Sequence, residues 1–306
     1  MATTRWKDRT TSKINDAINL LIDNVENDNR SSGISRENWK TSKVFDENRS
    51  ITLFGNEITY NVIRFTYDKI TLYEPDVNVI PQNGMVVVYL NDQTVSYIID
   101  KNSDAKQVLR KLLSYTGKNE IDDNRMHFDS DFFLWLINRV YYTNNTIEIA
   151  EENGFELELQ SIKGFVGDTE DSQTKVSASG ESVMNIISTL SFFLESRKLK
   201  QIKLDLKYKT HEKIELILKD GILEVDFKSY LGSFEQDSID ERMAKLYLMA
   251  YIEIVPLLVQ EYRTDIENDL WNKDCYVKFM NNVADTLKGK IEEKTKAINA
   301  GLPDID

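Results

Sequence analysis

The sequence feature that most constrains the fold is an alternation of apolar and charged residues over residues 201–230. From Ile202 to Tyr208 every second residue is apolar, and the residues between are Lys203, Asp205 and Lys207. The pattern returns over 214–219 and again over 223–228. Successive side chains of a strand point to opposite faces of a sheet. The alternation therefore predicts an antiparallel meander with one buried face and one wet, charged face.

A second strand-rich unit is predicted upstream, over residues 49–117. Apolar alternation on both sides of Gly55 indicates a hairpin. The continuous apolar run Met85–Leu90 is typical of a central strand covered on both faces. It turns at Asn91-Asp92, and a helix capped by Ser103 closes the unit. The unit is therefore expected to be an antiparallel sheet with at least one packed helix.

Residues 1–48 are predicted to be an N-terminal appendage to this unit. Apolar residues at helical spacing indicate an amphipathic helix over Thr11–Glu26. The mostly polar segment Asn27–Asn48 is expected to be a hinge or an exposed arm. Its Trp39, together with Trp6 near the chain start, is a candidate for contact with a partner.

An acidic, polar link over Lys118–Ser130 separates the first unit from residues 131–306, which are predicted to form an α+β unit. This second unit combines an apolar helix at Asp131–Tyr142, the meander and helical final segments, in which Pro256 is expected to kink or split a long helix. An acidic loop at Gly167–Gln173 and a helix opening at Gly180 are also expected. The fold class is thus α+β, with antiparallel sheets and packed helices.

Charge and composition restrict the range of functions. The formal net charge is −13, so binding of nucleic acid over a broad surface is disfavoured. The single cysteine, Cys275, and a polar N-terminus without an apolar core favour a reducing, cytoplasmic location without a signal peptide. The longest apolar stretch, Leu246–Val259, is shorter than the roughly 20 residues that span a bilayer, and it is expected to be a buried helix.

Few residues carry a recognisable catalytic pattern. The sequence holds neither a glycine-rich phosphate loop nor a nucleophile elbow. The two histidines, His127 and His211, are expected in a polar link and a turn, as solvated residues rather than catalytic ones. Glu253 is a candidate buried acid, although such residues more often lie on the polar stripe of a helix. The acidic residues 168–171 lack the ligand spacing of an EF-hand.

The strongest enzyme candidate lies on the meander. Asp205 and Lys207, and likewise Asp226 and Lys228, form Asp-x-Lys triplets that are expected on the charged strand faces. Two carboxylates and a lysine are what a Mg²⁺-dependent nuclease or phosphodiesterase needs to hold the metal and stabilise charge. Any charged amphipathic strand produces the same triplets by chance, and cross-strand ion pairs favour them.

The leading hypothesis is therefore a non-enzymatic interaction or regulatory subunit that binds a protein partner or self-associates. The final helical segment, Lys288–Lys296, mixes charges and is expected to be solvated or to await a partner, with Lys288 and Lys290 as contact candidates. An acidic inhibitor that mimics nucleic acid is a further alternative. The Lys-, Asn-, Ile- and Asp-rich composition is typical of low-GC bacterial or phage genes, and an assembly in phage–host conflict, either antiphage defence or its inhibition, is the working hypothesis.

Overall fold

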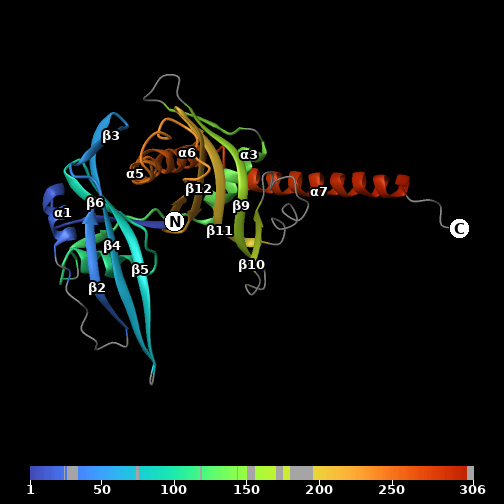
Figure 1. Cartoon of the computed structure of the whole chain (residues 1–306). Coiled ribbons are helices and arrows are strands. Elements are labelled where there is room, and N and C mark those ends of the chain that lie inside the picture. Colours follow the sequence, from blue (N-terminus) through green and yellow to red (C-terminus); the bar gives the residue numbers. More distant parts are fainter. Residues whose placement is uncertain are drawn as a thin grey trace. The chain divides into compact units, whose positions relative to one another are not determined.

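The computed structural model describes residues 1–23, 25, 34–73, 76–117, 119–142, 144–149, 156–169, 175–179 and 196–301. The chain divides into two compact units. Unit 1 comprises Met1–His127, Gly221–Phe227 and Phe234–Glu253; unit 2 comprises Phe128–Asp220, Lys228–Ser233 and Ile254–Asp306. The first boundary between the units, after His127, falls within the predicted polar link. Two later segments, Gly221–Phe227 and Phe234–Glu253, belong again to unit 1. The strands of the described residues pair in antiparallel fashion, and the fold is α+β (Figure 1).

Unit 1 is built on an antiparallel sheet in the order β13-β1-β6-β5-β4-β2, with β7 on β1 and β3 on β4. The long hairpin of β4 and β5 dominates it, and β2 runs along one edge of β4 (Figure 1). The strand bounds are β1 Ala2–Asp8, β2 Ile34–Lys43, β3 Arg49–Leu53, β4 Asn56–Tyr73, β5 Asp76–Asn91, β6 Thr94–Ile99, β7 Ile121–Asp123 and β13 Ile222–Val225.

Helices cover both faces of this sheet. The helices α1 (Ile14–Ile22) and α2 (Ala105–Leu112) pack in one hydrophobic core with Trp6 of β1. The neighbouring β1 residue Arg5 points the other way and donates to the carbonyl of Tyr251 at 3.0 Å. This double cover is why the run Met85–Leu90 is almost entirely apolar, and its residues 85–89 are all buried, as expected.

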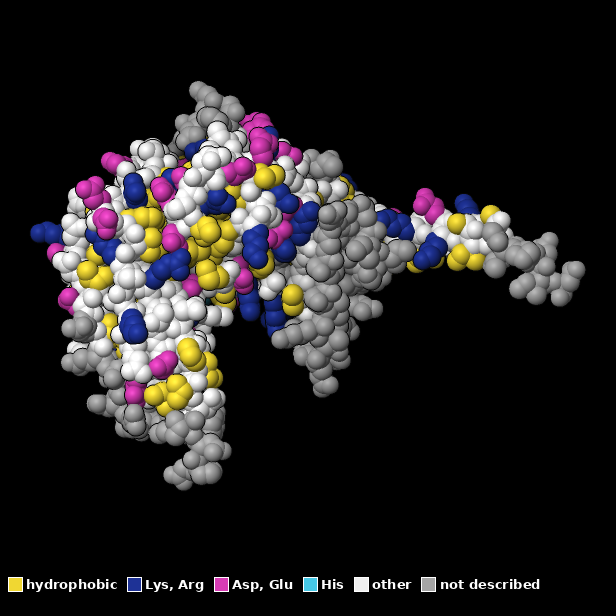
Figure 2. All heavy atoms as spheres, viewed as in Figure 1, with side chains coloured by type: hydrophobic (Ala, Val, Ile, Leu, Met, Phe, Trp, Pro, Cys, Tyr) yellow, Lys and Arg dark blue, Asp and Glu magenta, His cyan; other side chains and the backbone are white. Residues whose placement is uncertain are grey.

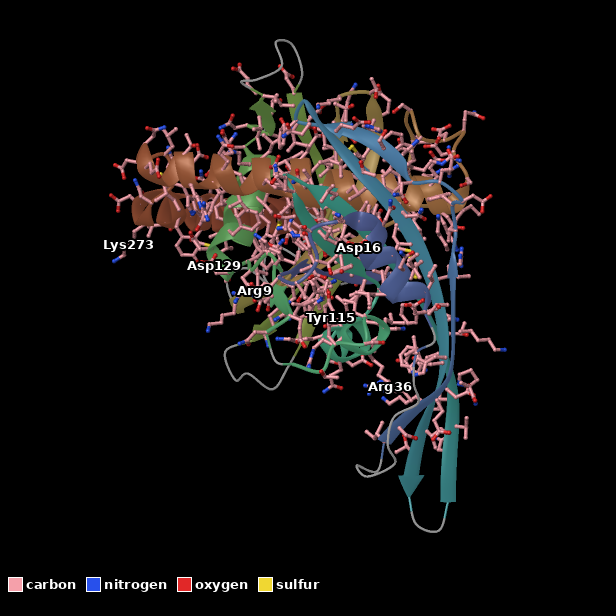
Figure 3. The ribbon with its side chains drawn as sticks, turned by 90° about the vertical axis from the view of Figure 1, so that its left-hand side faces the viewer. Arg9, Asp16, Arg36, Tyr115, Asp129 and Lys273 are labelled. Carbon is pink, nitrogen blue, oxygen red and sulfur yellow. The ribbon has the colours of Figure 1, made fainter. Side chains whose placement is uncertain are left out.

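The start of the chain is fixed in unit 1 by a buried carboxylate. Asp8, at the end of β1, accepts hydrogen bonds from the backbone N–H groups of Thr10 and Thr11 at 2.7 and 2.8 Å. It also accepts from the hydroxyls of Tyr97 and Tyr115, the latter labelled in Figure 3. A buried polar group needs such partners, and the network holds the N-terminal strand in the sheet.

Unit 2 is a layered sheet and helix structure. Its strands lie in the order β10-β9-β11-β12, with β8 on β9, and α3 packs on β9 and β11. Asp129 and Lys273, both labelled in Figure 3, mark the beginnings of α3 and α7. The bounds are α3 Ser130–Tyr141, β8 Thr146–Glu148, β9 Glu156–Thr169, β10 Lys175–Ser179, β11 Ser196–Tyr208, β12 His211–Lys219, α6 Val255–Glu267 and α7 Lys273–Gly301.

The helices of unit 2 are joined by a buried polar network. The indole of Trp135 donates to Asp265 at 2.7 Å, and Arg139 donates to the same carboxylate oxygen at 2.9 Å. Arg139 also pairs with Glu261. Since a buried charge is costly without a partner, this network fixes α3 against α6.

A long helical segment changes its hydrogen-bonding pattern ahead of Pro256. The helix α5 (Ile239–Met249) is followed by a π-helix, η2 (Ala250–Ile254), and then by α6, which has Pro256 in its first turn. Proline has no N–H to donate, and the predicted irregularity is confirmed. Among the described residues, Ile239–Glu267 is the one helix long and apolar enough to cross a membrane, and 67% of its most apolar window is buried inside the protein.

Several predicted elements are confirmed. The meander is present as β11, β12 and β13, the amphipathic helix as α1, and the hairpin turn at Gly55 between β3 and β4. Phe54 and Gly55 both have positive φ, 45° and 72°, as a tight hairpin turn requires.

Other predictions are wrong. Residues 34–43 are not an exposed arm but β2, which pairs with β4. Gly167–Thr169 belongs to β9 rather than to an acidic loop. The remainder of that loop, residues 170–173, and the helix predicted from Gly180 lie outside the described residues.

Candidate interaction site on the last helix

The helix α7 is attached to unit 2 by its first half. Phe279 and Val283 are fully buried. The ring of Phe279 meets that of Tyr141 edge-on at 5.5 Å, and the hydroxyls of Tyr141 and Thr286 lie 2.6 Å apart. These contacts with α3 end near residue 286. The outer half of α7 extends beyond the rest of unit 2 (Figure 1).

A second line of apolar residues follows α7 along its whole length. We call it the α7 stripe. Its members recur at intervals of three and four residues, which are the a and d positions of a heptad repeat. Val277 is 46% exposed, and Ile291 and Ile298 are each 50% exposed. The stripe consists of the apolar residues Val277, Met280, Ala284, Leu287, Ile291 and Ile298, together with one lysine, Lys294, at the remaining d position.

The α7 stripe lies on a different side of the helix from the attached face. Each residue of an α-helix turns the chain by about 100°, so the stripe is centred roughly a third of a turn from the line through Phe279 and Val283. The helix therefore buries one face and presents the other to solvent. Figure 2 shows hydrophobic side chains interspersed with lysines on the projecting part of the helix.

The sequence-predicted contact residues fall into two groups. Lys288 and Lys290 lie on the projecting half of α7, with Lys288 exposed. Trp6 and Trp39 do not lie in an exposed arm: Trp6 is 5% exposed in the core of unit 1, and Trp39 stacks on Tyr67 at 4.3 Å. Sequence reading missed this because β1 and β2 are short or polar and lie at the start of the chain.

An ion-pair cluster around the buried Asp205 forms part of the charged face of the meander in unit 2. Asp205 lies opposite Glu215 across β11 and β12. The Oδ2 atom of Asp205 is 3.2 Å from Lys163 Nζ and 3.9 Å from Lys213 Nζ. Its Oδ1 atom is buried and accepts no hydrogen bond from the described residues. The charged face is thus buried at Asp205, whose side chain is 7% exposed, and open to solvent at Lys207 and Glu212, whose side chains are 39% and 63% exposed.

The remaining triplet residues do not join this cluster. Lys207 pairs with Glu212 at 2.9 Å instead of with Asp205. The expectation that Asp226 and Lys228 lie on a strand is wrong, because β13 ends at Val225. Over the described parts of the chain, no three carboxylate, imidazole or thiol groups gather as a metal site. The geometry therefore gives the Mg²⁺-dependent nuclease alternative no assembled site among these residues.

Glu253 and His211 are both buried, and each has a close polar partner within the protein. Glu253 is 1% exposed in η2 and accepts from the N–H of Phe54 at 2.7 Å, which holds the β3–β4 turn in unit 1. His211 was expected to be solvated, but it is buried at the start of β12, with Nδ1 2.6 Å from the hydroxyl of Tyr230. Burial, and to a lesser extent the charge of Lys209, lowers the pKa of His211 to about 4.

No protein-family model and no curated protein matches this chain.

Proposed function

We propose that this chain is a non-enzymatic interaction or regulatory subunit of an intracellular assembly, and that it binds its partner through the α7 stripe. The observation that supports this proposal is the exposure of Ile291 and Ile298 on a helix that has already buried another face. Removing apolar surface from water is favourable, at about 25 cal/mol per Å². A partner that covers the stripe gains this energy without disturbing the packing of Phe279 and Val283.

The form of the stripe also supports a protein partner. Recognition of one amphipathic helix by another uses apolar anchors at regular helical intervals. The stripe supplies them from Val277 to Ile298, a distance of about 32 Å at 1.5 Å per residue. The first three members lie on the same half of α7 as Phe279 and Val283, whose burial attaches this half to unit 2.

The test is affinity purification of the tagged full chain from its native host. Wild type is compared with the double variant Ile291→Asp/Ile298→Asp and with a matched control, Ile239→Asp. Ile239 is 74% exposed at the beginning of α5, so it offers the same substitution on another helix. The expected result is a stoichiometric partner that co-purifies with wild type and the control and is lost from the double variant. Retention of that partner by the double variant would overturn the proposal.

A further inference from the structure

The charged residues of α7 are distributed unevenly around the stripe. With Val277 at an a position, Lys294 occupies a d position inside the stripe, whereas Lys288 and Lys290 occupy e and g positions on its two borders. Residues at e and g flank the contact between two helices and set the choice of partner. The exposed part of the stripe is therefore bordered by cations on both sides.

The acidic residues of the same segment lie elsewhere. Glu292 and Glu293 occupy b and c positions, more than a quarter of a turn away from the stripe at about 100° per residue. The stripe thus has a local positive border on a chain whose formal net charge is −13. Salt screens charges beyond about 8 Å at physiological ionic strength, so the charge that an incoming helix meets is the local one, and residues 287–301 carry four lysines and two glutamates.

This arrangement disfavours a second copy of the chain as the occupant. In a parallel pair of identical α7 helices, Lys294 would meet Lys294 of the other copy at a d position in the middle of the contact. In an antiparallel pair, Lys294 at a d position would face an apolar a position of the other copy, which leaves its charge in the contact without a carboxylate. Like charges placed opposite one another are destabilising.

We propose that the partner element that binds the α7 stripe is an acidic amphipathic helix. It carries apolar residues at its own a and d positions, Glu or Asp at e and g, and a carboxylate opposite Lys294. This inference rests on the proposed function and adds the chemistry of the partner. Opposite charges across e and g give selectivity of partner, while the apolar positions supply most of the binding energy.

The test uses two synthetic peptides of about 28 residues with identical Leu and Ile at a and d. One peptide carries Glu at e and g, and the other carries Lys at these positions. Fluorescence anisotropy measures their affinity for the full chain and for the triple variant Lys288→Glu/Lys290→Glu/Lys294→Glu. Wild type is expected to bind the acidic peptide at least about tenfold more tightly than the basic one, from three charge pairs. The triple variant is expected to reverse this preference, and Ile291→Asp/Ile298→Asp to bind neither peptide.

Three outcomes overturn the inference: equal affinity for the two peptides, tighter binding of the basic peptide, or binding of neither by wild type. Sedimentation of the chain alone is the companion measurement. If wild type is a dimer and Ile291→Asp is a monomer, the stripe binds a second copy of the chain instead. The two proposals fail separately. If the native partner is lost with Ile291→Asp/Ile298→Asp but still binds the triple variant, only the proposal of an acidic partner helix is wrong. If both variants retain the partner, the proposed function is wrong.

Discussion

Phe279 and Ile291 lie on the same helix with opposite surroundings: the ring of Phe279 is fully buried against Tyr141, whereas Ile291 is half exposed. The two residues belong to two different apolar faces of α7. One face holds the helix to unit 2, and the other is the stripe that we assign to a partner. Mutations on the two faces are therefore expected to have different consequences.

The first prediction separates these consequences. Phe279→Ala removes a fully buried ring and is expected to lower the free energy of unfolding of unit 2 by about 3–5 kcal/mol. Ile291→Ala is expected to change that free energy by less than about 0.5 kcal/mol, because the residue is on the surface. Chemical denaturation followed by far-UV circular dichroism measures both. A large loss of stability with Ile291→Ala would show that the stripe already packs within the chain.

A second prediction concerns the buried imidazole of His211. Burial lowers its pKa to about 4, below the ordinary value of 6.5. Between about pH 4 and pH 6.5, His211 is therefore protonated in the unfolded chain and neutral in the folded chain. The stability contributed by neutral His211 is present above pH 6.5 and is lost as the pH falls from about 6.5 to about 4. Denaturation of wild type and His211→Gln across this range is expected to show a flatter pH dependence for the variant, and parallel curves would contradict the assignment.

A third prediction has the opposite sign and concerns unit 1. Burial raises the pKa of Asp100 to about 6, from an ordinary value of 3.8, although its Oδ1 accepts from the N–H of Met85 at 2.9 Å. The folded state then holds the proton more tightly, so stability falls as the pH rises from about 4 to about 6. Asp100→Asn is expected to be more stable than wild type by about 1–3 kcal/mol at pH 7.5 and equal to it near pH 3. A variant that is less stable at pH 7.5 would show that the charged form is favoured.

A fourth prediction addresses the ion-pair cluster on the sheet of unit 2. Asp205→Ala removes the carboxylate that Lys163 and Lys213 approach, and leaves the pair of Lys203 and Glu215 in place. Removing one member of a buried ion pair is expected to cost about 3 kcal/mol of stability, seen as a lower midpoint of thermal unfolding. Partner binding by the folded variant is expected to be unchanged. Mg²⁺-dependent cleavage of nucleic acid by wild type that disappears in this variant would instead favour the nuclease alternative.

The elements that sequence predicted best are those whose pattern is set by a single buried face. The meander alternates strictly because one side of β11 and β12 meets the core, and α1 repeats its apolar residues for the same reason. The exposed end of α7 was also predicted, since residues 288–296 are almost all polar. In these elements local pattern and tertiary environment agree.

The elements that sequence missed are those whose position depends on distant parts of the chain. The strand β2 lies at the edge of a sheet, where charged residues and the irregular pairing around Asn38 are tolerated, so its residues resemble a linker. The burial of Trp6 could not be predicted from the neighbouring sequence, because its strand β1 pairs with β6, β7 and β13, which lie far away along the chain. The heptad spacing of the α7 stripe is visible in the sequence, but its exposure depends on which face Tyr141 covers.

The placement of Trp6 changes how truncations are interpreted. Removing the N-terminal residues through Trp39 would delete β1, α1 and part of β2, and so would unfold unit 1. Loss of binding by that truncation would therefore say nothing about an exposed arm. Point substitutions on the α7 stripe avoid this difficulty, because they leave both cores intact.

The most direct test of the central claim is hydrogen exchange of the full chain, alone and in complex with the purified native partner. In the free chain, amides of residues 287–301 are expected to exchange quickly, because residues 291–300 of this part of α7 are all exposed. Binding is expected to slow their exchange at least tenfold, with little change around Phe279. Protection confined to other parts of the chain, with residues 287–301 still exchanging quickly, would contradict the account.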